Sequence, residues 1–267
     1  VDMQKIVFNG HYLLYFDTAM AGYWRALALP YHDAMARLQG DLYVRKATLE
    51  YLGSARYDDL LDVGIRCGRI GNSSLVFDAA VFLGDTRLVH GELVYVFADP
   101  ATQTSRPVPP PLRELFLAFE AGQDVSRVQL GDWATLGSAA RTVRQAVFVD
   151  EQRIPADLVC DEADLTAVHA VAFNQLAMPV SAGRLLLSEP GLGQIGRMAS
   201  LAPVRGSGLG RSVLDALMQA ARERGDQALM LHAQTRAVPF YLRAGFRCQG
   251  PEIQEAGIAH QEMRLAL

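Results

Sequence analysis

The sequence predicts two domains, the first of the α+β class and the second of the α/β class. In the first half, one long helical pattern precedes four strand-like runs joined by short turns, which is typical of an antiparallel sheet packed on a helix. In the second half, a strand, a glycine-rich turn, a helix and another strand follow one another, and this order indicates a parallel crossover. A proline-rich stretch separates the two patterns.

An aromatic stripe marks the helix of the first half. Apolar residues recur every three or four positions, at Tyr12, Tyr15, Phe16, Ala19, Met20, Tyr23, Trp24 and Leu27. This spacing predicts a deeply packed helix. Four strands are expected after it, over residues 42–51, 59–69, 73–83 and 86–98. Turn signals such as "GNSS" and "GDT" separate the runs, so an antiparallel sheet is expected.

The domain boundary is expected between Asp99 and Asp124. Five prolines fall within residues 100–111, a density that neither a helix nor a central strand tolerates. A short apolar helix, "LRELFLAFEA", follows, and "GQDVS" resembles a flexible joint. We therefore expect one domain over residues 1–121 and another over residues 122–267, both of ordinary size.

The second half mixes helices and strands. We expect helices over residues 133–149, 212–223 and 237–244, and strands over residues 167–174, 180–187, 193–201 and 228–234. Because a glycine turn and a helix connect the last two strands, part of this sheet is expected to be parallel.

Composition limits the classes of partner. The chain has 25 basic and 29 acidic residues, a net charge of -4, which favours neither nucleic-acid binding nor an anionic membrane surface. The three cysteines are far apart and lack metal-ligand spacing, so we expect a reduced protein without a metal site. No apolar run reaches the roughly 18 residues of a membrane span, and no signal peptide is visible. A cytoplasmic protein is expected.

The stretch "VRGSGLGRS", residues 204–212, is typical of an anion-binding loop. Gly206, Gly208 and Gly210 allow the backbone to bring several N–H groups onto one ligand, just before a helix whose first-turn amides are unpaired. Arg205 and Arg211 add positive charge. The spacing fits neither a P-loop nor a dinucleotide-binding fingerprint. From these residues alone, a plain glycine-rich connection is an equal alternative.

The surrounding residues resemble a known family. "GRMASLAPVRGSGLGRSVLDALMQAARERG", followed by "LMLHAQTRAVPFYLRAGF", looks like the GCN5-related N-acetyltransferase (GNAT) family over residues 125–267. The resemblance implies acetyl-CoA or another acyl-CoA as substrate. It places Arg205, Gly208 and Gly210 on the CoA pyrophosphate, and it adds Gly206, Arg211 and Ser212 to the binding loop.

The same resemblance assigns the catalytic parts. It implies that the backbone amides of Met198 and Ala199, on a strand over residues 195–201, donate to the thioester carbonyl. Tyr241 becomes the acid that protonates the departing thiolate, and Gln234 stands where the family often has an Asn that contacts CoA. The general base is left open among four residues, Glu162, Asp164, His169 and His232.

The first domain resembles a second family. "VDMQKIVFNGHYLLYFDTA" and the later strand residues are similar to the 4-hydroxybenzoyl-CoA thioesterase-like (hot-dog) family over residues 1–120. The resemblance makes Asp2 the base or nucleophile on a thioester and directs an amide near Asn9 at the thioester oxygen. Because such sites form between subunits, it also implies a homodimer or tetramer.

Two residues depart from the hot-dog pattern. Lys5 stands where the family usually has Gly, and His11 where it often has Asn. Three hypotheses follow: a thioesterase fused to an acetyltransferase, an acetyltransferase beside a silent oligomerisation or acyl-CoA-binding domain, and a pair of CoA-sensing modules. Neither the acyl chain nor the amine acceptor follows from the sequence, since fold does not fix substrate.

Overall fold

The computed structural model describes all 267 residues and divides them into two compact units, Val1–Val125 and Ser126–Leu267. Each unit has its own sheet, of four strands in the first and seven in the second. The predicted combination of an antiparallel sheet with one long helix, followed by a mixed sheet, is confirmed.

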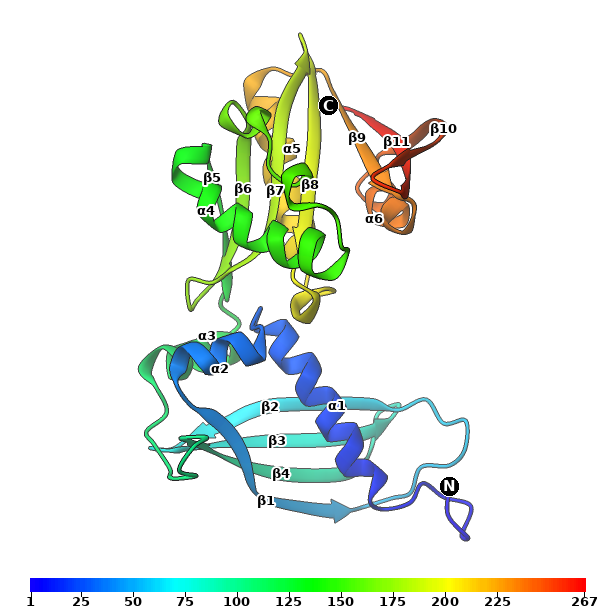
Figure 1. Ribbon diagram of the computed structural model, residues 1–267. Helices are drawn as coiled ribbons and strands as arrows, with labels where there is room; N and C mark the ends of the chain where they lie inside the picture. The colour runs from blue at the N-terminus through cyan, green and yellow to red at the C-terminus, as the bar shows by residue number, and fades with distance from the viewer. The chain divides into compact units, whose positions relative to one another are not determined.

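The first unit is an antiparallel sheet with a helix laid across one face (Figure 1). The helix α1 spans His11–Ala26. The sheet has the order β1-β4-β3-β2, with bounds Asp41–Tyr51, Thr86–Ala98, Ser74–Leu83 and Asp62–Ile70. A second helix, α2 (Tyr31–Leu38), precedes β1 and was not expected from the sequence.

The predicted aromatic stripe is the buried face of α1. Its buried residues are Tyr12, Phe16, Met20, Tyr23 and Trp24. Phe16 is fully buried, and its ring lies over Gly91 of β4, where a Cβ atom would come within 2.6 Å of the ring. A glycine at this point of the strand therefore allows the helix to approach the sheet closely.

The proline-rich stretch packs onto the first unit instead of separating the two domains. Val108 is buried and its amide donates to the Asn72 carbonyl, so the segment lies against the sheet. The next helix, α3 (Pro110–Glu120), begins with two prolines because a first helical turn needs no backbone donor there. At its end, Glu120 accepts hydrogen bonds from the Tyr23 hydroxyl and the Cys67 amide.

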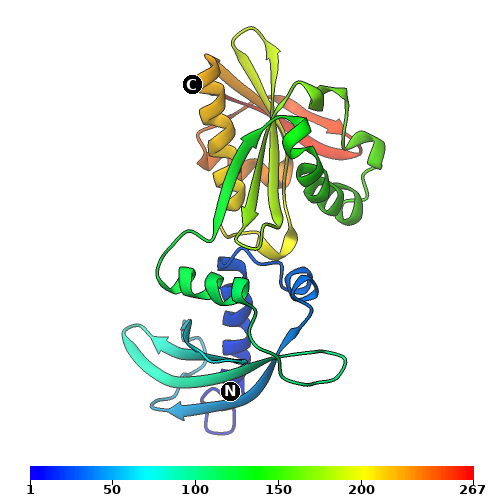
Figure 2. The same cartoon turned by 90° about the vertical axis from the view of Figure 1, so that its left-hand side faces the viewer.

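The second unit is a seven-stranded sheet of order β10-β11-β9-β8-β7-β6-β5. The strands are β5 (Ser126–Gly131), β6 (Val168–Asn174), β7 (Pro179–Glu189), β8 (Leu192–Ser200), β9 (Ala228–Gln234), β10 (Arg247–Glu255) and β11 (Ile258–Ala266). The helices α4 (Trp133–Arg144) and α5 (Leu209–Arg224) cover opposite faces, as Figure 2 shows, and α6 (Val238–Arg243) follows β9. β5, β10 and β11 were not expected.

The parallel pair expected from the crossover is β8 with β9. It extends over only three residue pairs, from Leu192 with Ala228 to Gln194 with Met230, after which the strands separate. Two predicted helix ends were wrong. The α-helical part of α4 stops at Arg144 and continues as a π-helical segment, Gln145–Glu151, and α5 begins at Leu209, inside the glycine-rich loop.

The close approach of α1 to Gly91 predicts a position-specific loss of stability. Gly91→Ala would place a methyl group against the Phe16 ring and should lower the free energy of unfolding by about 1–3 kcal/mol. Gly64→Ala is the matched control, since nothing lies within 4 Å of its Cβ position in β2. Urea unfolding, followed by Trp24 fluorescence in a Trp133→Phe background, measures both. Equal effects of the two substitutions would contradict this packing.

Candidate functional site

A bulge in β8 shapes the site of the second unit. Between the pairs Ala182 with Ala199 and Arg184 with Gly196, β7 advances two residues while β8 advances three. Arg197 lies in this bulge with a φ of 54°, a left-handed conformation that is unfavourable for arginine. Met198 follows it, and its sulfur lies where a side chain at Gly183 would otherwise stand.

A network of charged side chains, buried at Asp164 and partly exposed at Asp161 and Arg197, holds the bulge. The Arg197 guanidinium donates to the Leu158 carbonyl and to Asp161, each at 2.9 Å. Arg184 of β7 forms a two-pronged pair with Asp161, at 2.6 and 2.9 Å, and also donates to Asp164 at 2.8 Å. These charged hydrogen bonds offset the energetic cost of the left-handed conformation at Arg197.

The network extends to α4 and includes two of the candidate bases. Arg144, the last residue of α4, donates to both carboxylate oxygens of Asp164, and both side chains are fully buried. His169 is also fully buried, and its Nε2 bonds to the Asp164 carbonyl at 2.9 Å. Burial lowers the pKa of His169, so its ring is neutral. Asp164 and His169, two of the four candidate bases, are therefore fully buried and bonded within this network.

The glycine-rich loop presents unpaired backbone donors. Gly206 and Gly208 have φ values of 87° and 91°, a conformation that side-chain-bearing residues rarely adopt. The amides of Ser207, Arg211 and Ser212 donate to carbonyls within the loop. Those of Gly206, Gly208, Leu209 and Gly210 have no protein acceptor. These four donors stand at the positive end of α5, an arrangement that suits an anion.

A cavity of about 710 Å³ brings most of the predicted CoA-site residues together. Its lining includes Met198, Ala199, Arg205, Gly206, Gly208, Gly210, Arg211, Gln234 and Tyr241. Ser212 does not line it, since its amide and hydroxyl both bond to the Gly208 carbonyl. Two further arginines do, Arg236 and Arg243, which the sequence analysis missed. Both lie within "LMLHAQTRAVPFYLRAGF", a stretch that already carries the family resemblance, and this was the available signal.

Two predicted ligand residues already have protein partners. Arg205 pairs with Glu151 through both terminal nitrogens and donates from Nε to the Ser200 carbonyl at 3.0 Å. Gln234 donates to Gln152 at 2.9 Å and accepts from Arg236 at 3.1 Å. Arg205 thus fastens the loop to the π-helical segment, and Gln234 links that segment to β9.

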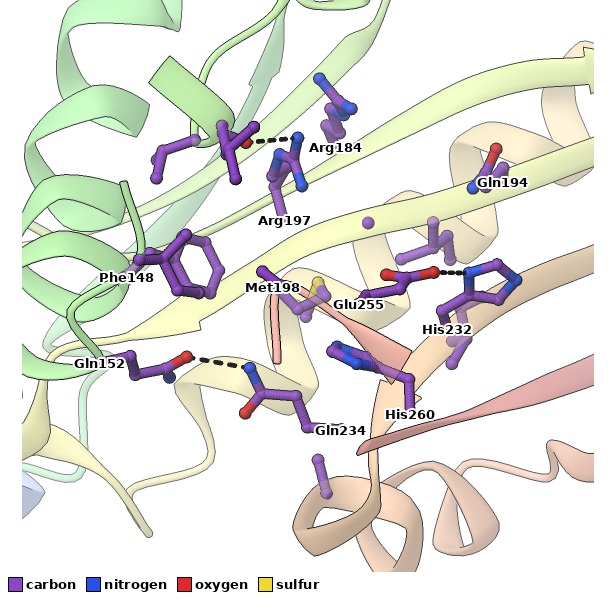
Figure 3. Close-up of a pocket in the computed structure, with 18 of the residues that line it drawn as sticks. Phe148, Gln152, Arg184, Gln194, Arg197, Met198, His232, Gln234, Glu255 and His260 are labelled. Carbon is purple, nitrogen blue, oxygen red and sulfur yellow. Dashed lines mark hydrogen bonds and ion pairs between the residues drawn. The ribbon is translucent and has the colours of Figure 1, made fainter. Parts of the chain in front are cut away.

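A second cavity, of about 520 Å³, shares Gln152, Met198, Gln234, Ala237 and Tyr241 with the first. Tyr241 is 7% exposed, and burial raises the pKa of its hydroxyl above the usual value. His232, Glu255 and His260 line another part of this cavity, and the His232 Nδ1 bonds to the Glu255 carboxylate (Figure 3). The two cavities therefore meet at Tyr241 and Met198, beside the divergence of β8 and β9.

The N-terminal candidates lie on a compact turn of the first unit. One Asp2 carboxylate oxygen accepts the Gln4 amide at 2.8 Å, and Lys5 takes the left-handed conformation with a φ of 62°. Lys5 thus has a backbone conformation that glycine adopts more readily than lysine. Asn9 precedes Gly10, the N-cap of α1, and neither amide has a protein acceptor. Neither Asp2 nor Asn9 lines either of these two cavities.

Comparison with known proteins identifies the two halves. Residues 147–267 match the acetyltransferase (GNAT) domain, and residues 4–90 match the thioesterase superfamily. The uncharacterized N-acetyltransferase YjcF of Bacillus subtilis is 38% identical over 122 residues, which are 45% of this chain and 86% of that protein. The chain belongs to the GNAT family. It joins this acetyltransferase domain to a thioesterase-superfamily domain, and a GNAT domain takes an acyl-CoA as substrate.

Solved structures resemble each half. A crystal structure from Lactobacillus plantarum, provisionally assigned as an N-acetyltransferase, is 29% identical, with a TM-score of 0.50, and covers 54% of this chain and 99% of that one. The DHNA-CoA thioesterase of Staphylococcus aureus is 18% identical, with a TM-score of 0.40, and covers 45% and 83%. No group of three or more His, Cys, Asp or Glu residues is placed to hold a metal, and none of the helices could cross a membrane.

The ion network predicts how stability depends on pH. The hydrogen bonds from Arg184 hold the pKa of Asp161 at about 2, below its usual 3.8. The stabilisation is therefore complete above about pH 4 and is lost as the pH falls towards 2. Asp161→Asn should lower the free energy of unfolding of the GNAT domain at pH 7. The difference from wild type should shrink as the pH falls from about 4 to 2.

Urea unfolding followed by Trp133 fluorescence, in a Trp24→Phe background, measures this difference. Asp215→Asn is the control, because Asp215 forms only an exposed i,i+4 pair with Arg211 and should change the stability little. A difference for Asp161→Asn that stays constant from pH 7 to pH 2 would contradict the role given to the network.

Proposed function

We propose that the chain is a bifunctional acyl-CoA enzyme, with a thioester hydrolase in residues 1–121 and an acetyl-CoA-dependent N-acetyltransferase in residues 122–267. One observation carries the transferase assignment: four unpaired amides, a strand bulge and a buried tyrosine line two adjacent cavities that have Met198 and Tyr241 in common. The unpaired amides can bind the CoA pyrophosphate, the bulge can polarise the thioester carbonyl, and the tyrosine can protonate the thiolate.

The first cavity is the proposed CoA site. The amides of Gly206, Gly208, Leu209 and Gly210 bind the pyrophosphate, with the helix dipole of α5 behind them. Arginines around the cavity add positive charge: Arg205, Arg211, Arg236 and Arg243. Because Arg205 is paired with Glu151, its main contribution is to hold the loop in place, and the backbone supplies the direct contacts.

The chemistry takes place where the cavities meet. The thioester carbonyl lies against the backbone of Met198 and Ala199, whose amides stabilise the developing oxyanion. The amine nitrogen forms a bond to the carbonyl carbon, the carbon–sulfur bond breaks, and Tyr241 protonates the departing thiolate. Since burial raises the pKa of Tyr241, its hydroxyl keeps its proton at neutral pH until the thiolate forms.

His232 is the proposed general base. Its Nδ1 bonds to Glu255, which orients the ring and leaves Nε2 as the proton acceptor for the attacking amine. His232 also lines the acceptor cavity, unlike Glu162, which is exposed and lies outside that lining. His232 therefore has both an orienting carboxylate and access to the acceptor cavity, whereas Asp164 and His169 are buried and do not line that cavity.

The N-terminal hydrolase rests on a different arrangement. Asp2 acts on the thioester as base or nucleophile, and the free amide of Asn9 at the start of α1 stabilises the oxyanion. Segments 1–9 and 51–57 hydrogen-bond to each other, and large apolar side chains are exposed on and beside them: Met3, Phe8, Leu14, Tyr57 and Leu60. This exposed surface supports a homodimer or tetramer formed through the first domain.

A catalytically silent first domain is the alternative. One oxygen of Asp2 is already engaged by the Gln4 amide within the turn, which favours a structural role for this carboxylate. In that case the domain provides oligomerisation or acyl-CoA binding, and the acetyltransferase is the only activity.

The pyrophosphate assignment predicts a selective loss of CoA affinity. Gly208→Val should weaken CoA binding at least about tenfold, because a β-branched residue is strained at a φ of 91° and would displace the loop amides. Gly225→Val is the matched control, since Gly225 has a φ of 90° at the other end of α5. Calorimetric titration with CoA measures both variants. Equal CoA affinity in the two variants would contradict the assignment.

The two proposed activities predict separable patterns of thiol release. With a panel of acyl-CoAs and no amine, release should disappear in Asp2→Asn and persist in Tyr241→Phe. With an amine mixture, the additional release should fall at least about tenfold in Tyr241→Phe and in His232→Gln, because each loses a proton-transfer step.

The thiol-release assay also decides between the two hypotheses for the first domain. Release that always requires an amine, and that Asp2→Asn leaves unchanged, would contradict the hydrolase and favour the silent domain.

A further inference from the structure

The acceptor-side cavity has two chemically different ends. Arg184 and Arg197 lie at one end, and His232, Glu255 and His260 lie at the other, with Met198 between them (Figure 3). The CoA-side arginines, Arg205, Arg211, Arg236 and Arg243, line only the other cavity. The positive charge at the Arg184–Arg197 end is therefore separate from the charge assigned to the pyrophosphate.

The network at that end has an excess of positive charge. Three arginines, Arg144, Arg184 and Arg197, face two aspartates, Asp161 and Asp164. The neighbouring His169 adds no compensating charge, because burial keeps its ring neutral. The network thus holds one guanidinium charge more than its carboxylates, and Arg197, whose side chain is 31% exposed, can present that charge to an anionic ligand.

Arg197 and Arg184 both retain unused hydrogen-bond donors. Arg197 donates only through Nη2, to Leu158 and Asp161, while its Nε is buried without a partner and its Nη1 makes no hydrogen bond. The Nε of Arg184, a residue that is 7% exposed, is likewise unpartnered. Burial, and then the charge of Arg184, lowers the pKa of Arg197, which reflects this incomplete compensation.

Six large apolar side chains also line the cavity. They are Phe148, Ile154, Leu158, Val159, Leu186 and Ile195. A ligand of the whole cavity therefore needs an oxyanion at the arginine end, a group that His232 can deprotonate at the other end, and an apolar portion between or beside them.

We propose that the amine acceptor carries an oxyanion, a carboxylate or a phosphate, which binds Arg197 while the amine faces His232. Small amphipathic amino acids and phosphorylated amines belong to this class. The inference rests on the proposed acetyltransferase function, since it names the substrate class of that same site. Arg197 would thus both recognise the acceptor and, through the bulge, position it beside Met198 and the thioester.

The test measures binding of reaction products, so that it does not depend on turnover. The CoA-saturated full chain is screened by thermal shift against the N-acetyl forms of the twenty amino acids and their carboxamides. N-acetylphosphoethanolamine is paired with N-acetylethanolamine to distinguish phosphate from carboxylate. The best pair is then titrated by calorimetry into wild type, Arg197→Gln, Arg197→Lys and Arg264→Gln. Arg264 is the matched control, an arginine with one carboxylate partner outside the cavity.

Wild type and Arg264→Gln should bind the anionic member of the pair at least tenfold more tightly than the neutral member. The ratio of the two affinities should fall close to one in Arg197→Gln. It should recover in part in Arg197→Lys, which keeps the positive charge but lacks the planar guanidinium group. CoA affinity in each variant reports an intact fold.

Two results would overturn the inference: equal binding of anionic and neutral members throughout the panel, or a preference that survives Arg197→Gln. Its failure is distinguishable from failure of the proposed function. If no amine supports thiol release but the anion preference depends on Arg197, the transferase proposal falls and the oxyanion site stands.

Discussion

The ion network around Asp161 and Asp164 is the constraint on which the second domain depends. It ties the end of α4, the turn before β6, the strand β7 and the bulge of β8 to one another through charged hydrogen bonds. Without these partners, a left-handed arginine in a strand would be unfavourable. The bulge lies just beyond the point where β8 and β9 stop pairing, so the network supports the opening that contains both cavities.

The two domains share one backbone feature, although their architectures differ. In each, a helix begins after a turn with left-handed residues and leaves backbone amides unpaired: Asn9 and Gly10 before α1, and Gly206, Gly208, Leu209 and Gly210 at α5. Lys5 takes the left-handed conformation in the turn before α1. Under the proposed function both domains use an acyl-CoA, which gives a physical reason for the fusion of a thioesterase-superfamily domain to a GNAT domain.

Strong local periodicity explains what the sequence predicted well. The aromatic stripe of α1, the four strands of the first unit and the β8–α5–β9 crossover all have short-range patterns. The glycine loop could be located because its residues are adjacent in the chain, and the family resemblance supplied Tyr241. The exposed β10 strand and the short β5 strand lack such a pattern, since pairing with a neighbouring strand defines them.

The network itself could not be predicted, because Arg144, Asp164 and Arg184 are twenty residues or more apart and meet only after the sheet has formed. For the same reason, Asp164 and His169 were open candidates for the base until their burial was known. The pair of His232 with Glu255 likewise depends on the fold, since it joins β9 to the outermost strand, β10.

A crystal structure of the full chain with acetyl-CoA would locate the thioester and the pyrophosphate in the second domain. We expect the pyrophosphate within about 3 Å of the amides of Gly206, Gly208, Leu209 and Gly210, as hydrogen bonding requires. We also expect the thioester to lie beside Met198, with its sulfur facing Tyr241. A pyrophosphate bound away from this loop, or a thioester outside the opening between β8 and β9, would contradict the assignment of the second domain's site.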